Sequence, residues 1–168
     1  MKHLFNILAP IALVFIATSC EKPGGEKYDE AVESALVGKW EYTIDISYSG
    51  TDYTTGLPVS GERTFKGTFT WDDYLHGLLG GDLEECYSYL DGSVDDGHLT
   101  FIEDRFTWSE NGNYYKAFCT WNSVPVTKKT KEFTTTCGKW SYLDIDYADG
   151  HEVHTDDINA TFKAKKIN

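Results

Sequence analysis

The stretch that decides the fold is GKWEYTIDISY, residues 38–48. Apolar residues occupy every second position from Trp40 to Tyr48, and polar residues lie between them. Because successive side chains of a strand point to opposite sides, this alternation indicates a strand with one buried and one wet face. Ser49 and Gly50 follow, and both are typical of turns. The stretch therefore predicts a half-buried strand that ends in a turn.

The same pattern continues along the chain. Residues 64–71 alternate in the same way, and residues 158–164 repeat the alternation near the C-terminus. Asn111 and Gly112 lie between two aromatic-rich runs, and they tolerate the positive φ angles that a tight hairpin turn needs. Residues 74–79 differ, because their leucines recur at helical spacing, which favours a short helix or a structured loop.

These patterns predict an all-β fold of about eight or nine antiparallel strands. Strands do not alternate with helices, so a parallel α/β fold is excluded. The open choices are an up-and-down β-barrel and a β-sandwich. Sequential hairpins favour the barrel, and closure would also remove the exposed edges of long strands. We expect this barrel to occupy residues 35–168.

The first residues predict an export signal. Lys2 and His3 form a short basic region, and residues 4–17 are mainly apolar but too few to cross a bilayer. The following Ala-Thr-Ser-Cys, residues 17–20, resembles the lipobox of bacterial lipoproteins. The resemblance implies that residues 1–19 are a lipoprotein signal peptide, that Cys20 is lipidated, and that residues 20–34 are a flexible tether. It places the protein in the bacterial cell envelope, held at the outer membrane by its N-terminal lipid.

The composition narrows the range of partners. The chain has 27 acidic and 15 basic residues and a formal net charge of −12. Nucleic acid is excluded as a partner, since phosphate binding needs a basic footprint. The same balance argues against electrostatic docking on anionic lipid.

One short sequence occurs twice in the chain. Gly38-Lys39-Trp40 recurs as Gly138-Lys139-Trp140, but the residues that follow do not keep the same register. This repeat indicates that two strands have similar residue preferences, rather than that a segment was duplicated. We expect both tryptophans to pack in the core.

Residues 36–40, with the pattern L-x-G-x-W, precede and open the first strand. Together with the lipobox, this pattern resembles bacterial lipocalin-like (calycin-type) lipoproteins. The resemblance implies an eight-stranded up-and-down barrel in which Gly38 and Trp40 close one end. It also implies that a late basic side chain covers the tryptophan, a position for which Lys163, Lys165 and Lys166 are the candidates. The function it implies is binding of a small apolar or amphipathic ligand, without catalysis.

The ligand-binding candidates are Trp71, Trp108 and Trp121, which lie near predicted strand ends. In a hollow barrel such residues line an apolar cavity. On an outward face they would instead form a surface for a glycan or a protein, and in a filled domain they are core and cross-strand packing. The sequence leaves these three readings open.

The remaining reactive residues predict no catalytic, metal or cofactor site. Nucleophile elbow, P-loop and dinucleotide fingerprint patterns are absent from the sequence. His151 and His154 are three apart, which on a strand places them on opposite faces, and the cysteine spacing matches no zinc pattern. An oxidising envelope permits a disulfide between Cys119 and Cys137, with unbridged thiols as the alternative.

Overall fold

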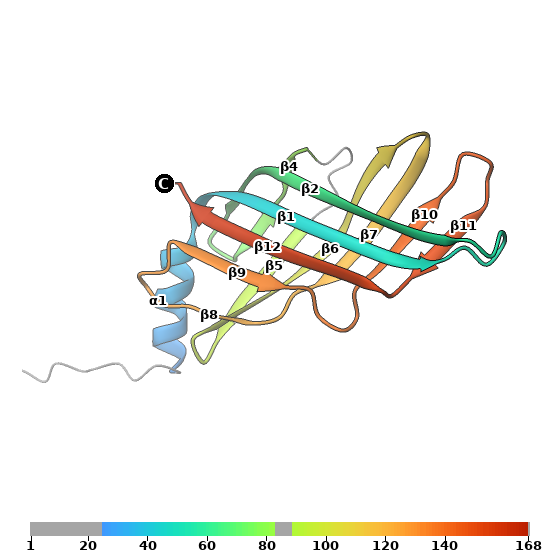
Figure 1. Cartoon of the computed structure of the whole chain (residues 1–168). Coiled ribbons are helices and arrows are strands. Elements are labelled where there is room, and N and C mark those ends of the chain that lie inside the picture. Colours follow the sequence, from blue (N-terminus) through green and yellow to red (C-terminus); the bar gives the residue numbers. More distant parts are fainter. Residues whose placement is uncertain (1–24, 83–88, 168) are drawn as a thin grey trace, which may run out of the picture.

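The structure is a computed structural model that describes residues 25–82 and 89–167. Over these residues one helix is followed by antiparallel strands, which confirms the predicted all-β class (Figure 1). The elements are α1 Glu26–Leu36, β1 Gly38–Thr51, β2 Pro58–Trp71, β3 His76–Leu78, β4 Gly80–Gly81, β5 Tyr89–Asp95, β6 His98–Glu110, β7 Asn113–Thr120, β8 Val124–Pro125, β9 Glu132–Thr136, β10 Tyr142–Asp146, β11 Glu152–Thr155 and β12 Ile158–Lys166. The predicted signal peptide, Cys20 and Cys86 lie outside the described residues.

The described strands form two antiparallel sheets. The first has the order β4-β2-β1-β12-β9, and the second has the order β11-β10-β7-β6-β5-β3, with β8 paired to β6. A single bridge between Trp121 and Cys137 joins the sheets beside β9. The ladders within the described ranges do not form one continuous ring, so the closed barrel stays a prediction.

Strand β1 lies at the centre of the first sheet, as its alternation predicts. It pairs along its whole length with β2 and over residues 40–48 with β12. Tyr42, Ile44 and Ile46 are buried, and the residues between them lie on the outer face. The strand is therefore the element around which the first sheet is built.

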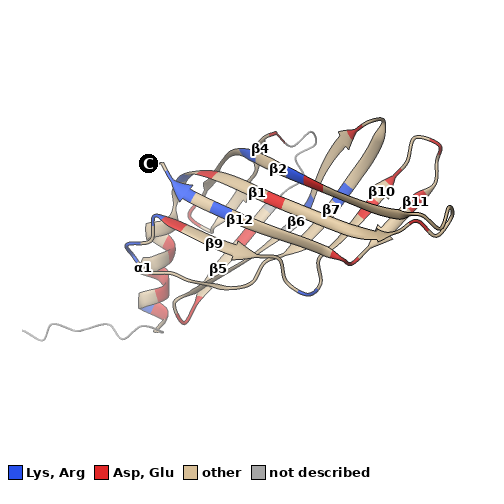
Figure 2. Ribbon diagram, viewed as in Figure 1, with Lys and Arg blue, Asp and Glu red and all other residues tan. Residues whose placement is uncertain are grey.

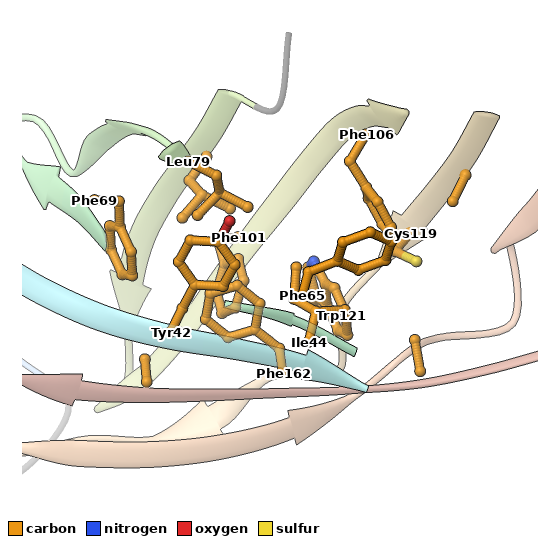
Figure 3. Packing of buried hydrophobic residues seen from close by; sticks show 14 of the residues in the cluster. Tyr42, Ile44, Phe65, Phe69, Leu79, Phe101, Phe106, Cys119, Trp121 and Phe162 are labelled. Carbon is orange, nitrogen blue, oxygen red and sulfur yellow. The ribbon is translucent and has the colours of Figure 1, made fainter. Parts of the chain in front are cut away.

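Aromatic rings from the two sheets meet in the core (Figure 3). Phe162 on β12 lies with its ring centre 5.3 Å from that of Phe101 on β6, and Phe65 on β2 lies 5.5 Å from Phe106 on β6. All four side chains are buried. Edge-to-face pairs of this kind add to the stabilisation from area burial, so the interior is filled rather than hollow at this level.

Helix α1 corrects the predicted tether. Residues 26–34 were expected to be flexible, but they form most of α1, which packs against β5. Val32 and Leu36 are buried, and the Asp29 carboxylate accepts the backbone N–H groups of Asp96 and Gly97 at 3.1 and 2.9 Å. The polar sequence of this segment resembles that of a linker, but its Asp29 carboxylate is hydrogen-bonded to backbone N–H groups of the β5–β6 turn. Such contacts across the chain leave no periodic signal.

The two turn predictions had different outcomes. Asn111 and Gly112 adopt φ angles of 53° and 82° between β6 and β7, which confirms the predicted hairpin. Of the two alternatives for residues 74–79, the helix is wrong, because they form a structured turn and the short strand β3. The reason is local, because the Asp72 carboxylate accepts the N–H groups of Tyr74 and His76, both at 2.9 Å, and this favours a turn over a helix.

Candidate functional site

One end of the domain is closed around Trp40. This side chain is fully buried, and its indole N–H donates to the Leu36 carbonyl at 2.8 Å. Lys166 lies with Nζ 5.9 Å from the ring centre and donates to the carbonyls of Ala35 and Val37. Of the three candidate lysines, Lys166 therefore takes the covering position, at the basic end of β12 beside α1 (Figure 2).

The closed end depends on two further features of the chain. Gly38 has a φ of 128°, a conformation that side chains disfavour, and it leads from α1 into β1. Burial lowers the pKa of the Lys166 ammonium, and the neighbouring Lys131 lowers it further. Helix, first strand and last strand are thus tied together at the chain segment where the sequence resemblance is sharpest.

All three ligand-candidate tryptophans are buried in the packed core. Trp71 contacts Trp40 and Phe133, with ring centres 5.6 and 5.9 Å away. Trp121 packs against Phe162 with ring centres 5.3 Å apart. Both tryptophans are buried, so neither presents a ring to solvent for a surface ligand.

Trp108, the third candidate, lines a pocket at the end of the domain away from α1. The pocket has a volume of about 240 Å³, and its walls come from both sheets. Figure 1 shows the β1–β2 loop and the β10–β11 turn at this end. The lining residues include Tyr48 on β1, Arg63 on β2, Trp108 and Glu110 on β6 and Tyr115 on β7. We refer to this site as the mouth pocket.

The mouth pocket has an aromatic wall and a charged wall. The rings of Trp108 and Tyr115 stack with centres 4.9 Å apart and planes within 4°. The ring of Tyr48 lies 6.1 Å from that of Tyr115, and burial together with the Tyr115 hydroxyl raises the Tyr48 pKa. Arg63 Nη1 lies 3.2 Å from Glu110 Oε2, and both side chains are partly exposed. The pocket therefore has a buried aromatic wall next to a partly exposed ion pair.

Gly61 makes the position of Tyr48 possible. It lies opposite Tyr48 in the β1–β2 ladder, and a Cβ at this position would come 2.5 Å from the tyrosine hydroxyl oxygen. Without a side chain there, the Tyr48 ring crosses over β2. A pair of residues 13 apart across a hairpin is thus needed to shape one wall of the pocket.

Next to the mouth pocket lies a histidine between two carboxylates. His151 Nε2 lies 3.1 Å from Asp52 Oδ2, and Nδ1 is bonded to Asp149. The His151 ring stacks on Tyr147 with centres 4.3 Å apart, and burial, followed by the electrostatic influence of Tyr115, raises the pKa of Tyr147. The β10–β11 turn with His151 and the β1–β2 loop with Asp52 lie at the same end of the domain as the mouth pocket (Figure 1).

A second group of aromatic side chains lies on the outer face of the second sheet. Tyr142 on β10 contacts Phe118 on β7 and His154 on β11, with both ring centres 5.3 Å away. A depression of about 110 Å³ beside them is lined in part by Lys116 and Asp144. In the sequence these outward-facing residues alternate with buried ones, as in any half-buried strand. The alternation therefore predicts that they face outward but does not single them out as a binding surface.

The two candidate disulfide cysteines are thiols in the structure. Cys119 is buried on β7, as Figure 3 shows, while Cys137 is half-buried. The Cys137 sulfur lies 3.1 Å from the backbone nitrogen of Ala160 and 3.5 Å from the carbonyl oxygen of Ile158. Cys137 is thus part of the contact between β9 and β12 rather than one half of a bridge.

Among the described residues, no group of three or more His, Cys, Asp or Glu side chains is arranged so that it could hold a metal ion. Over the same part of the chain, α1 is too short and too polar to span a bilayer, and no other helix meets that requirement.

The sequence predicted Trp108 as a ligand-binding residue but did not predict the other residues that line the mouth pocket. Tyr48, Arg63, Glu110 and Tyr115 come from four different strands. The one sequence feature that these residues share is a place toward the end of a hairpin, and hairpin ends form the ends of barrels and sandwiches. Comparisons with protein-family models and with curated proteins gave no match.

Proposed function

We propose that this protein is a lipid-anchored envelope protein, lipocalin-like in type, that binds a small amphipathic ligand without catalysis. The observation that supports this proposal most is the mouth pocket, to which both sheets contribute convergent polar groups beside aromatic rings. The pocket is concave, and its lining combines aromatic residues with polar and charged ones such as Arg63, Glu110 and Asn111, which can orient a small ligand. The opposite end is closed by α1, Trp40 and Lys166.

The pocket walls limit the ligand class. The half-buried ring of Tyr48, backed by the buried rings of Trp108 and Tyr115, offers contact to an apolar part of a ligand. Arg63, Glu110 and the Tyr48 hydroxyl offer hydrogen bonds to a polar part. A volume of about 240 Å³ accommodates a small molecule or one end of a longer one. Because aromatic rings fill the interior below, the proposed ligand sits at the mouth and not in a deep calyx.

The proposed anchor orients this pocket. Only residues 21–25 separate Cys20 from α1, and five extended residues reach at most about 18 Å. With lipid on Cys20, the α1 end would lie close to the bilayer, and the mouth pocket at the other end would face away from it. A lipocalin-like barrel closed on the membrane side fits this arrangement.

The anchor is tested by labelled palmitate. Cells expressing the full chain are expected to incorporate the label into this protein, and Cys20→Ala is expected to abolish incorporation, because the acyl chains need that sulfur and the new N-terminus behind it. Cys137→Ala, which keeps the lipobox intact, is the matched control and should label normally. Equal labelling of the Cys20→Ala protein would contradict the lipoprotein assignment.

The pocket is tested by ligand capture. Protein purified from its own envelope is expected to carry a small molecule visible by native mass spectrometry. Arg63→Met should weaken its binding about tenfold or more, since a hydrogen bond to a charged group contributes roughly 1.5–3 kcal/mol. Tyr48→Phe removes only a hydroxyl and should also weaken binding while preserving the fold, as checked by circular dichroism. Unchanged affinity in both variants would count against the mouth pocket.

A second candidate function is a glycan- or protein-binding surface on the outer face of the second sheet. The observation that favours it is the outward group of Phe118, Tyr142 and His154 beside the depression lined by Lys116 and Asp144. The same capture experiment separates the two candidates when Tyr142→Ala is included. Loss of binding in Tyr142→Ala but not in Arg63→Met would move the site to the outer face.

A further inference from the structure

We propose that His151 is a pH-dependent clasp that joins the β1–β2 loop to the β10–β11 turn and so holds the two sheets together beside the mouth pocket. The clasp needs no ligand, so it stands independently of the proposed function. It is defined by three residues, His151 with Asp52 and Asp149.

The geometry makes His151 a link between distant parts of the chain. Asp52 and His151 are 99 residues apart in sequence, yet Nε2 and Oδ2 are 3.1 Å apart. The His151 side chain is only 19% exposed and that of Asp52 only 6%. Because the pair is largely shielded from water, it is less screened than a surface ion pair.

Asp52 also organises the loop that it connects. Its carboxylate accepts the Thr54 N–H at 2.8 Å and the Thr55 hydroxyl at 2.6 Å, and its carbonyl accepts the Gly56 N–H at 2.6 Å. The Asp52 N–H donates to the Leu57 carbonyl at 2.9 Å. The loop of residues 52–57 is thus held by Asp52, and the contact to His151 attaches this loop as a unit to the second sheet.

Protonation decides how many carboxylates His151 can hold. The imidazolium has two N–H donors and can donate to Asp52 and Asp149 together, whereas neutral imidazole has only one. On the other side of the ring lies Tyr147, a neutral phenol whose pKa is raised by burial. The groups facing His151 are therefore two carboxylates and a tyrosine that stays neutral near neutral pH.

The direction of the pH dependence follows from these neighbours. The hydrogen bond to Asp149 and the charges of Asp149 and Asp52 raise the His151 pKa above its ordinary value of 6.5. The stabilisation by the clasp is therefore complete below about pH 6.5 and is lost as the pH rises through the raised pKa. Hydrogen bonds from the Thr55 hydroxyl and from the Thr54 and Thr55 N–H groups lower the Asp52 pKa to about 2, so this carboxylate stays charged throughout that window.

The same hairpin offers a matched control. His154 also lies between two carboxylates, with Nδ1 2.6 Å from Asp144 and Nε2 3.2 Å from Asp156. Its pKa is raised for the same kind of reason. However, its side chain is 58% exposed, and these ionic contacts stay within β10, β11 and the residue that follows. A charge change at His154 therefore leaves the β1–β2 loop unaffected.

The test follows the backbone mobility of residues 54–56 by nuclear magnetic resonance. The mature chain in detergent micelles is compared at about pH 5.5 and about pH 8.5, on either side of the ordinary histidine pKa. In the unsubstituted protein, the heteronuclear Overhauser effects of these amides should indicate order at the lower pH and increased mobility at the higher pH. In His151→Gln the pH response should disappear, and in His154→Gln it should persist.

A second variant keeps the test valid if His151→Gln fails to fold. Asp149→Asn removes the exposed carboxylate, leaves Asp52 and its loop contacts in place, and should shift the midpoint of the response to lower pH. A loop that is equally ordered at both pH values in the unsubstituted protein would overturn the clasp, as would a response that survives in His151→Gln.

Discussion

Trp40→Ala is expected to lower the free energy of unfolding by about 4 kcal/mol, the range found when large buried aromatic residues are truncated. Trp40 is fully buried, and its ring centre lies 5.6 Å from those of both Trp71 and Phe133. The substitution also removes the indole N–H that donates to the Leu36 carbonyl and the ring under Lys166. The measurement is urea denaturation followed by far-ultraviolet circular dichroism.

Trp140→Ala is the matched control. Trp140 follows the same Gly-Lys pair as Trp40, but its side chain is 74% exposed and lies near Lys139, with Nζ 5.4 Å from the ring centre. Its removal is expected to change the free energy of unfolding by no more than about 0.5 kcal/mol. Similar losses for the two variants would contradict the assignment of Trp40 alone to the core.

Gly67→Ala is expected to destabilise the domain by about 3 kcal/mol, since overpacked sites give losses of this order. A Cβ at Gly67 would lie 1.6 Å from the carbonyl oxygen of Gly80 and 2.8 Å from the ring of Tyr42. The first obstacle is backbone, which cannot rotate away as a side chain can. We expect the β2–β4 ladder to separate, which amide hydrogen exchange of residues 80–82 would report together with the loss of stability.

Gly80→Ala tests the same ladder from the other strand. Here the added Cβ would meet only the Thr68 carbonyl oxygen, at an ordinary contact distance of 3.6 Å. The variant should stay within about 1 kcal/mol of the unsubstituted protein, the ordinary range for a glycine-to-alanine exchange. A loss as large as that of Gly67→Ala would show that the ladder tolerates no side chain at all, and that the close approach at Gly67 is not the cause.

The sequence predicted local features better than distant contacts. The alternation in residues 38–48 predicted β1 and its buried face, and the Asn111-Gly112 pair predicted the β6–β7 hairpin. The helical spacing in residues 74–79 was misleading, because the contacts of the Asp72 carboxylate set the turn there. The polar, Gly- and Pro-rich residues 21–27 predicted a tether through residue 34, whereas Asp29 and Glu33 of α1 bind backbone N–H groups more than 60 residues away.

The candidate site could be predicted only in part. Trp108 was selected for its place near a strand end, and it does line the mouth pocket. All three tryptophans are buried in the core, and Trp108 differs from Trp71 and Trp121 only in lying in the wall of this pocket. The wall residues Tyr48 and Arg63 were not selected, since nothing in a single strand shows which hairpin tips will meet.

The chain by itself determined which faces of its strands are apolar, where its tight hairpin turns, and that its body is antiparallel β. Those properties depend on residues within a few positions of one another, through the two-residue period of a strand and the positive φ angles of a turn. The tertiary structure alone decided that Gly38-Lys39-Trp40 closes one end while Gly138-Lys139-Trp140 is exposed, and that His151 reaches Asp52 across 99 residues. The physical reason is that burial and ion pairing depend on which strands become neighbours, and this is set by the packing of the two sheets as a whole.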